Sequence, residues 1–90
     1  MKFVEEPDRF VLLDDEGREA GEITWALAED VMIVDHTFVD DKYRGKGYAV
    51  DLVRHVVDKA RRDDEKVLPL CPFARKEFQE KPEYQDVLRK

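Results

Sequence analysis

The sequence predicts a mixed α/β (α+β) domain, in which an antiparallel meander of strands leads into a parallel β-α-β crossover and a C-terminal helix. Three observations support this fold class. The apolar, β-branched run at residues 31–39 is typical of a central strand, residues 49–62 repeat apolar positions with helical spacing, and residues 66–71 have the composition of a short strand. A strand, a helix and a second strand in this order form a parallel pair with a right-handed crossover. The expected sheet holds about four to five strands.

The first strands are separated by turn residues. Residues 1–6 are either a frayed lead or a short edge strand, and residues 9–13 form the first secure strand. A turn follows, in which Gly17 supplies a positive φ. Because residues 10–13 would form an exposed sheet edge that can pair with a second copy, a monomer or a weak homodimer is expected.

The second strand is predicted at residues 19–27, where apolar and polar residues alternate loosely. Gly21 is the candidate position for a β-bulge within it. Trp25 is most simply a packing residue on the sheet. Residues 28–30 then turn the chain back into the central strand at residues 31–39.

The helix after residue 47 has the strongest pattern in the chain. Its apolar positions form one stripe at three- and four-residue spacing: Ala49, Leu52, Val53, Val56, Val57 and Ala60. The opposite face is charged, and His55 on that face is expected to be a solvated surface residue. Pro72 opens a second helix at residues 72–78, and a further short helical segment is expected at residues 83–88.

Length, composition and charge restrict the possible functions. Ninety residues predict a single domain at residues 1–90, and a formal charge of −6 argues against nucleic acid as the main partner. A single cysteine excludes an intramolecular disulfide and fits a reducing compartment. No apolar stretch suits a membrane span or a signal peptide, so a cytoplasmic protein without a membrane partner is expected. Two histidines and one cysteine lack the spacing of a zinc site, and no metal is predicted.

A glycine loop joins the central strand to the helix. Residues 44–49, Arg-Gly-Lys-Gly-Tyr-Ala, fit the pattern Arg/Gln-x-x-Gly-x-Gly/Ala. Glycines let backbone N–H groups approach an anion, and the first turn of a helix offers unpaired donors and the positive end of its dipole. Lys42, Arg44 and Lys46 form a local basic patch that offsets the overall negative charge. The loop therefore predicts a phosphate-binding site, although it lacks the ending of an NTPase P-loop and the three-glycine dinucleotide pattern.

Together with two flanking motifs, the loop resembles the pyrophosphate loop of the GNAT superfamily of acetyl-CoA-dependent N-acetyltransferases. The similarity is closest to a small single-domain branch, which carries His-Thr-x-Val before the loop and Pro-x-Cys-Pro/Ser-Phe/Tyr after the next strand. Here these motifs are His36-Thr-Phe-Val39 and Pro69-Leu-Cys-Pro-Phe73. The resemblance covers approximately residues 10–88 and implies a GNAT-like mixed sheet.

The resemblance also implies a set of residues that bind acetyl-CoA. The coenzyme A pyrophosphate would be held by backbone N–H groups of Arg44, Gly45, Lys46, Gly47, Tyr48 and Ala49. The pantetheine arm would pair with the backbone of Thr37, Phe38 and Val39, and the thioester would lie between the diverging ends of the strands at residues 31–39 and 66–71. We expect no counterpart of the N-terminal helices that wall the acceptor site in larger members. The acceptor is therefore left open, an amine being one candidate.

Cys71 and His36 are the candidate catalytic residues. Cys71 follows a strand and precedes a helix that starts with proline, and the nearby Arg75 and Lys76 would favour its thiolate. It is either a nucleophile that accepts the acetyl group, as the same position in the small branch suggests, or a buried structural thiol. His36, on the neighbouring strand, is either its base or thiolate partner or, as we favour, a histidine that hydrogen-bonds within the sheet.

Strand alternation would place His36 and Phe38 on one face, and Asp35, Thr37 and Val39 on the other. If transfer to the acceptor is direct, the candidate bases are Glu22, Asp30 and Asp35.

We therefore predict an acyltransferase that moves an acetyl group from acetyl-CoA to an unidentified acceptor, with Cys71 as a candidate carrier. The alternative is a coenzyme A-binding module with little or no catalysis, which acts as a regulatory or interaction protein.

Overall fold

The computed structural model of the chain describes residues 1–89. Its five strands are β1 (Lys2–Glu6), β2 (Arg9–Leu13), β3 (Glu19–Ala28), β4 (Val31–Val39) and β5 (Lys66–Pro69). The helices are α1 (Tyr48–Asp63) and α2 (Pro72–Glu80), with short 3-10 helices η1 (Asp41–Tyr43) and η2 (Pro82–Tyr84). The strands lie side by side in chain order; β1 to β4 are antiparallel, whereas β4 and β5 are parallel. The predicted fold class is confirmed.

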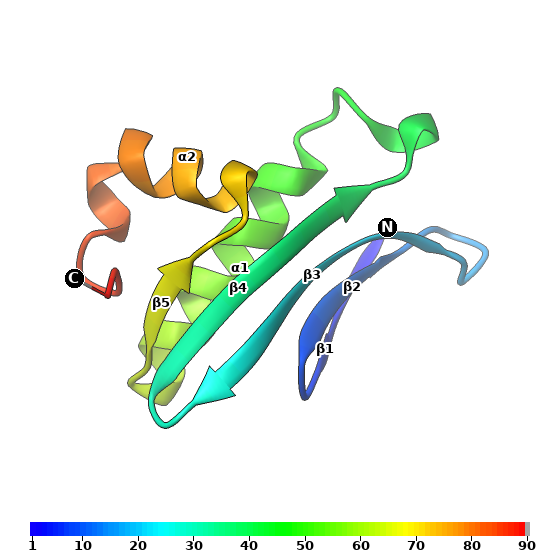
Figure 1. The fold of residues 1–90 in the computed structure, drawn as a ribbon. Coiled ribbons are helices and arrows are strands. Elements are labelled where there is room, and N and C mark those ends of the chain that lie inside the picture. Colours follow the sequence, from blue (N-terminus) through cyan, green and yellow to red (C-terminus); the bar gives the residue numbers. More distant parts are fainter. Residues whose placement is uncertain (90) are drawn as a thin grey trace.

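The core lies between the sheet and α1. In Figure 1, α1 covers one face of the sheet and, in the described part of the chain, no helix covers the opposite face. The predicted stripe faces the core, because five of its residues are at most 1% exposed: Leu52, Val53, Val56, Val57 and Ala60. Trp25 is also buried, as expected. Within residues 1–89, no helix is both long and apolar enough to cross a bilayer.

The first residues form a true edge strand. Because β1 pairs with β2 along its whole length, residues 10–13 do not form a sheet edge as the sequence suggested; the edge is β1. This strand also brings Phe3 beside α1. The imidazole of His55 therefore packs against two aromatic rings. Its ring centre lies 4.3 Å from that of Phe3 and 5.4 Å from that of Phe10. The prediction that His55 is a solvated surface residue was wrong.

Two bulges shape the strands that reach the loop. In β3, Gly21 lies opposite Leu12 and Glu19 opposite Leu13, so the extra residue is Ala20, next to the predicted position. Between β3 and β4, Thr24 lies opposite His36 and Trp25 opposite Val34, so Asp35 is the extra residue. This second bulge was not predicted, and it changes which side chains share a face at the end of β4.

Replacing Gly21 with alanine should destabilise the protein by about 1–3 kcal/mol, because a Cβ atom there would lie 2.7 Å from the Phe38 carbonyl oxygen. Urea denaturation measures the loss. The amide resonances of residues 37–39 should shift as well. Gly17→Ala is the control, because the Cβ atom added there would meet no other group within 4 Å. This variant should lose only the stability that an alanine with a positive φ costs. Unchanged resonances in β4 would contradict the predicted clash.

The C-terminal elements differ from prediction in two places. β5 ends at Pro69, two residues before the predicted end of this strand at residue 71. The ladder stops there because the N–H groups of both Leu70 and Cys71 donate to the Val34 carbonyl. Of the helical segment predicted at residues 83–88, only the first two residues are helical, within η2. After η2 the chain runs beside β5, where Val67 N–H donates to the Val87 carbonyl and Arg89 N–H to the Val67 carbonyl. These bonds pair the outer edge of β5, and that pairing outweighs local helix preference.

Candidate functional site

The glycine loop ends in an open helix N-terminus. Gly45 and Gly47 have φ values of 82° and 81°, a left-handed conformation that glycine adopts without strain. Gly47 is the N-cap of α1, and no side chain in the described part of the protein caps this end of the helix. The N–H groups of the first turn therefore have no partner within the helix and are free to bind an anion, as the sequence predicts.

A groove of about 230 Å³ lies at this helix end. Six of the predicted binding residues line it: Val39, Arg44, Gly45, Gly47, Tyr48 and Ala49. Thr37, Phe38 and Lys46 lie outside it. The groove has three further lining residues, Tyr43, Val50 and Phe73. Phe73 belongs to the Pro-x-Cys-Pro-Phe motif but was not predicted to line the site, since nothing local to α2 indicates that it approaches the loop.

The cationic side chains of the loop are largely engaged within the protein. The Arg44 guanidinium donates to the Val39 carbonyl at 3.0 Å and pairs with Asp41 at 2.7 Å. The Lys42 ammonium lies 5.7 Å from the centre of the Tyr43 ring. The predicted basic patch is thus partly neutralised, and the free backbone donors are the main feature that attracts an anion.

A hydrogen bond ties η1 to the β2–β3 turn. The Tyr43 hydroxyl donates to Asp14 Oδ2 at 3.0 Å, and this bond raises the pKa of the phenol. The Asp14 carboxylate also accepts the N–H groups of Arg18 and Glu16, each at 2.9 Å. The pKa of Asp14 lies below its ordinary value of 3.8, chiefly through the Arg18 bond and also through the Tyr43 bond. Asp14 therefore holds one wall of the groove in place.

Replacing Asp14 with alanine should lower the melting temperature at pH 7 by a few degrees. Because the pKa of Asp14 is depressed by folding, its contribution to stability is present above pH 3.8 and is lost as the pH falls below that value. The difference between the wild-type and variant melting temperatures should therefore shrink on acidification, as followed by circular dichroism from pH 7 to 2.5. Asp15→Ala, which removes the same charge from a carboxylate that binds only the N-terminal amine, is the control. A difference that does not depend on pH would contradict the role of Asp14.

Strands β4 and β5 diverge beside the groove. Their last paired residues are Val34 and Pro69. Beyond that point β4 continues to Val39, whereas the chain after β5 turns away into α2. Within residues 1–89, no strand therefore lies beside residues 35–39 on the β5 side, and their backbone groups on that side are open to a ligand amide.

Cys71 lies at the mouth of this divergence. It is the N-cap of α2, and its Sγ atom accepts the Ala74 N–H at 3.5 Å and lies 3.2 Å from Thr37 Oγ1. The residue is 6% exposed. Arg75 instead donates to the Leu70 carbonyl, and Lys76 pairs with Glu80. The polar contacts of the sulfur thus come from the Thr37 hydroxyl and the helix end, not from the two cations named by the sequence.

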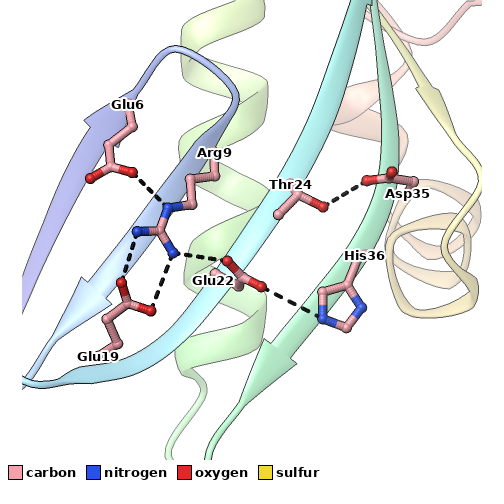
Figure 2. Close-up of polar contacts among 7 residues, drawn as sticks. All are labelled: Glu6, Arg9, Glu19, Glu22, Thr24, Asp35 and His36. Carbon is pink, nitrogen blue, oxygen red and sulfur yellow. Dashed lines mark hydrogen bonds and ion pairs between the residues drawn. The ribbon is translucent and has the colours of Figure 1, made fainter.

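His36 lies on the opposite face of the sheet from the thiol. Thr37 is opposite the fully buried Ile23 and faces the core, whereas His36 is opposite Thr24 and faces outward. Figure 2 shows the His36 ring on the sheet face away from α1, where its Nε2 lies 3.8 Å from Glu22 Oε2. The structure therefore does not bring His36 and Cys71 together, and the Cys–His pair, the less favoured alternative, is not formed.

The three candidate bases are also separated from Cys71. Because of the bulge, Asp35 lies on the outer face with His36, not with Thr37 and Val39 as alternation predicted, and it accepts the Thr24 hydroxyl at 2.6 Å. Glu22, on the same face, accepts from Arg9 at 3.0 Å. Asp30 lies in the β3–β4 turn, at the opposite end of β4 from the loop.

Comparison with known proteins assigns these features to a family. A model of the GCN5-related N-acetyl-transferase family matches residues 9–87. The fold is similar to that of a GCN5-like protein from Staphylococcus aureus, with 30% sequence identity and a TM-score of 0.79; the match covers 98% of this chain and 87% of that chain. Among curated protein sequences, none matches the chain significantly.

Two structures solved with coenzyme A are also similar. A GNAT-family N-acetyltransferase from Escherichia coli, in complex with CoA, has 27% identity and a TM-score of 0.61, over 66% of this chain and 37% of that one. N-acetylglutamate synthase from Neisseria gonorrhoeae, complexed with coenzyme A and N-acetyl-glutamate, has 22% identity and a TM-score of 0.66, over 81% of this chain and 18% of that one, and shows the fold alone. With its glycine loop, open helix end and diverging strands, and with a family match along most of its length, the chain belongs to the GCN5-related N-acetyl-transferase family.

Proposed function

We propose that the protein binds acetyl-CoA at the glycine loop and transfers its acetyl group to an acceptor by way of Cys71. The observation that carries the proposal is the uncapped N-terminus of α1, which opens into the groove beside Gly45 and Gly47. It is supported by the E. coli family member solved with CoA.

The residues of the site fit this ligand. The first turn of α1 offers backbone donors for a diphosphate, and the two glycines place no Cβ in its path. The open side of β4 at residues 35–39 offers backbone groups of the kind that pair with the amides of a pantetheine arm. Against this, the charge of −6 opposes a polyanion, so the local donors must outweigh a long-range repulsion. Such repulsion is screened by salt, whereas contacts within a groove are screened much less.

When bound, acetyl-CoA supplies an activated acetyl thioester. Cys71 Sγ would form a new C–S bond to the acetyl carbon as the original C–S bond breaks, and the thiol proton of Cys71 passes to the departing sulfur. In the second half, an amine nitrogen of the acceptor takes the acetyl group from Cys71, and its proton returns to Sγ. Thr37 Oγ1, at 3.2 Å, would orient the sulfur in both halves.

Calorimetric titration of acetyl-CoA into the protein tests the first part of the proposal. We expect measurable heat at low ionic strength and a rise in melting temperature with ligand concentration, because a ligand that binds only the native state stabilises it. If neither heat nor stabilisation is observed, the proposed binding site is wrong and the function has to be sought elsewhere.

Mass spectrometry of the protein incubated with acetyl-CoA tests the second part. We expect an acetyl adduct on Cys71 that disappears when a competent amine is added. Binding without any adduct, together with full turnover in Cys71→Ala, would rule out the carrier role and leave direct transfer. Binding without turnover on any acceptor would favour the alternative function, a coenzyme A-binding module.

A further inference from the structure

A second cavity lies beside α2 and shares no lining residue with the groove at the glycine loop. Its volume is about 480 Å³, within the range of small-molecule sites. Most of its wall is apolar and comes from Pro69, Phe78, Pro82 and Leu88. The cavity exists because the chain after η2 returns along the edge of β5, where Leu88 forms a bridge with Val67. Helix α2, η2 and this returning segment border it, and one side is open to solvent.

One cation, Arg75, lines the cavity together with two neutral amides, Gln79 and Gln85. Six of the other seven arginines form ion pairs with carboxylates: Arg9, Arg18, Arg44, Arg54, Arg61 and Arg62. The seventh, Arg89, is exposed, does not line this cavity and forms no ion pair within residues 1–89. Arg75 forms none with any carboxylate of residues 1–89; its guanidinium donates only to the Leu70 carbonyl, at 3.3 Å. In a chain with 22 acidic and 16 basic residues, a lack of carboxylates does not explain this. The guanidinium keeps most of its donors free at the edge of an apolar cavity.

We infer that this cavity binds a small apolar monocarboxylate. A guanidinium matches the two oxygens of a carboxylate, and the apolar wall matches an aliphatic or aromatic body. A single negative charge suits the site better than a phosphate ester, because Arg75 is the only cation among residues 1–89 that lines it and the protein carries a net charge of −6. The site is separate from the one proposed for acetyl-CoA, so its ligand is a second molecule.

The test uses the ¹⁵N-labelled full chain and a matched pair of probes, 4-phenylbutyrate and its neutral analogue 4-phenylbutanamide. We expect both to shift amide resonances between residues 75 and 88, with the carboxylate binding about three- to tenfold more tightly. Arg75→Gln should abolish this preference. Lys76→Gln is the matched control, because it removes the same charge from the neighbouring residue, which does not line the cavity; it should retain the preference.

The comparison of the two probes on the wild-type protein does not depend on any variant folding. Equal affinity of the wild-type protein for the two probes would overturn the inference. So would resonance shifts confined to residues 44–49, since they would place the probe in the other groove. A preference that survives Arg75→Gln in a folded variant would show that another group binds the carboxylate, and would overturn the assignment to Arg75. None of these results depends on whether acetyl-CoA binds.

Discussion

Replacing Ala49 with aspartate should weaken acetyl-CoA binding at least about 30-fold while leaving the protein folded. Ala49 is the second residue of α1 and lines the groove. A carboxylate there would compete with a diphosphate for the same N–H groups and repel it at short range. In the free protein the same carboxylate lies at the positive end of the helix dipole, where it stabilises a helix by about 0.3–1 kcal/mol.

The two effects have opposite signs, which separates a loss of binding from a loss of folding. The melting temperature of the free Ala49→Asp protein should be equal to that of the wild type or higher, whereas calorimetry should detect little heat with acetyl-CoA. Ala49→Asn is the control, because it has nearly the same shape without the charge and should retain most of the affinity. If the aspartate and asparagine variants bind acetyl-CoA equally well, the diphosphate does not lie at this helix end.

Replacing Cys71 with serine should eliminate the acetyl adduct and lower turnover by about 100-fold or more, if Cys71 carries the acetyl group as proposed. Serine is chosen because Cys71 is the N-cap of α2 and its sulfur accepts the Ala74 N–H. A serine oxygen caps a helix well, so the fold should survive the change, whereas an unactivated hydroxyl is a weak nucleophile. Mass spectrometry and a free-thiol assay for released coenzyme A measure the two effects.

Thr37 provides an independent check on the same step. Its hydroxyl lies 3.2 Å from the Cys71 sulfur. Thr37→Val keeps the shape and removes the hydrogen bond, and should slow adduct formation about tenfold. Thr37→Ser keeps the hydroxyl and should restore the rate. Equal rates in the two variants would show that the hydroxyl does not orient the sulfur, and full turnover in Cys71→Ser would rule out the carrier role itself.

Local patterns were sufficient to predict the parts of the site that lie close together in the chain. Gly45 and Gly47 indicate a backbone that needs positive φ, and the stripe that starts at Ala49 indicates a helix beginning directly after them. Both features are properties of a few consecutive residues. For the same reason, Pro72 was sufficient to predict that Cys71 lies at a helix N-terminus.

Most of the predictions that were wrong depended on which strands pair and in which register. The bulge at Asp35 depends on how β3 pairs with β4, and it brings Asp35 onto the outer face with His36. The environment of His55 depends on β1, whose Phe3 packs against its ring. The helical segment predicted at residues 83–88 is confined to η2, because the chain after it pairs with the edge of β5, which offers partners that an isolated segment does not have.

By itself, the sequence determined the strand–loop–helix–strand order around the glycines, the loop that needs their positive φ and the position of the single cysteine at a helix start. Apolar periodicity, glycine conformation and proline placement are each set by a few consecutive residues and do not depend on residues far away in the chain. Only the tertiary structure decided which face of the sheet each polar side chain occupies, and that the thiol lies beside Thr37 and not beside His36. It also decided that Arg75 lines a cavity and that its guanidinium pairs with no carboxylate of residues 1–89. These contacts join residues far apart in the chain, and pairing, bulges and the docking of the C-terminal segment set them through the packing of the whole domain.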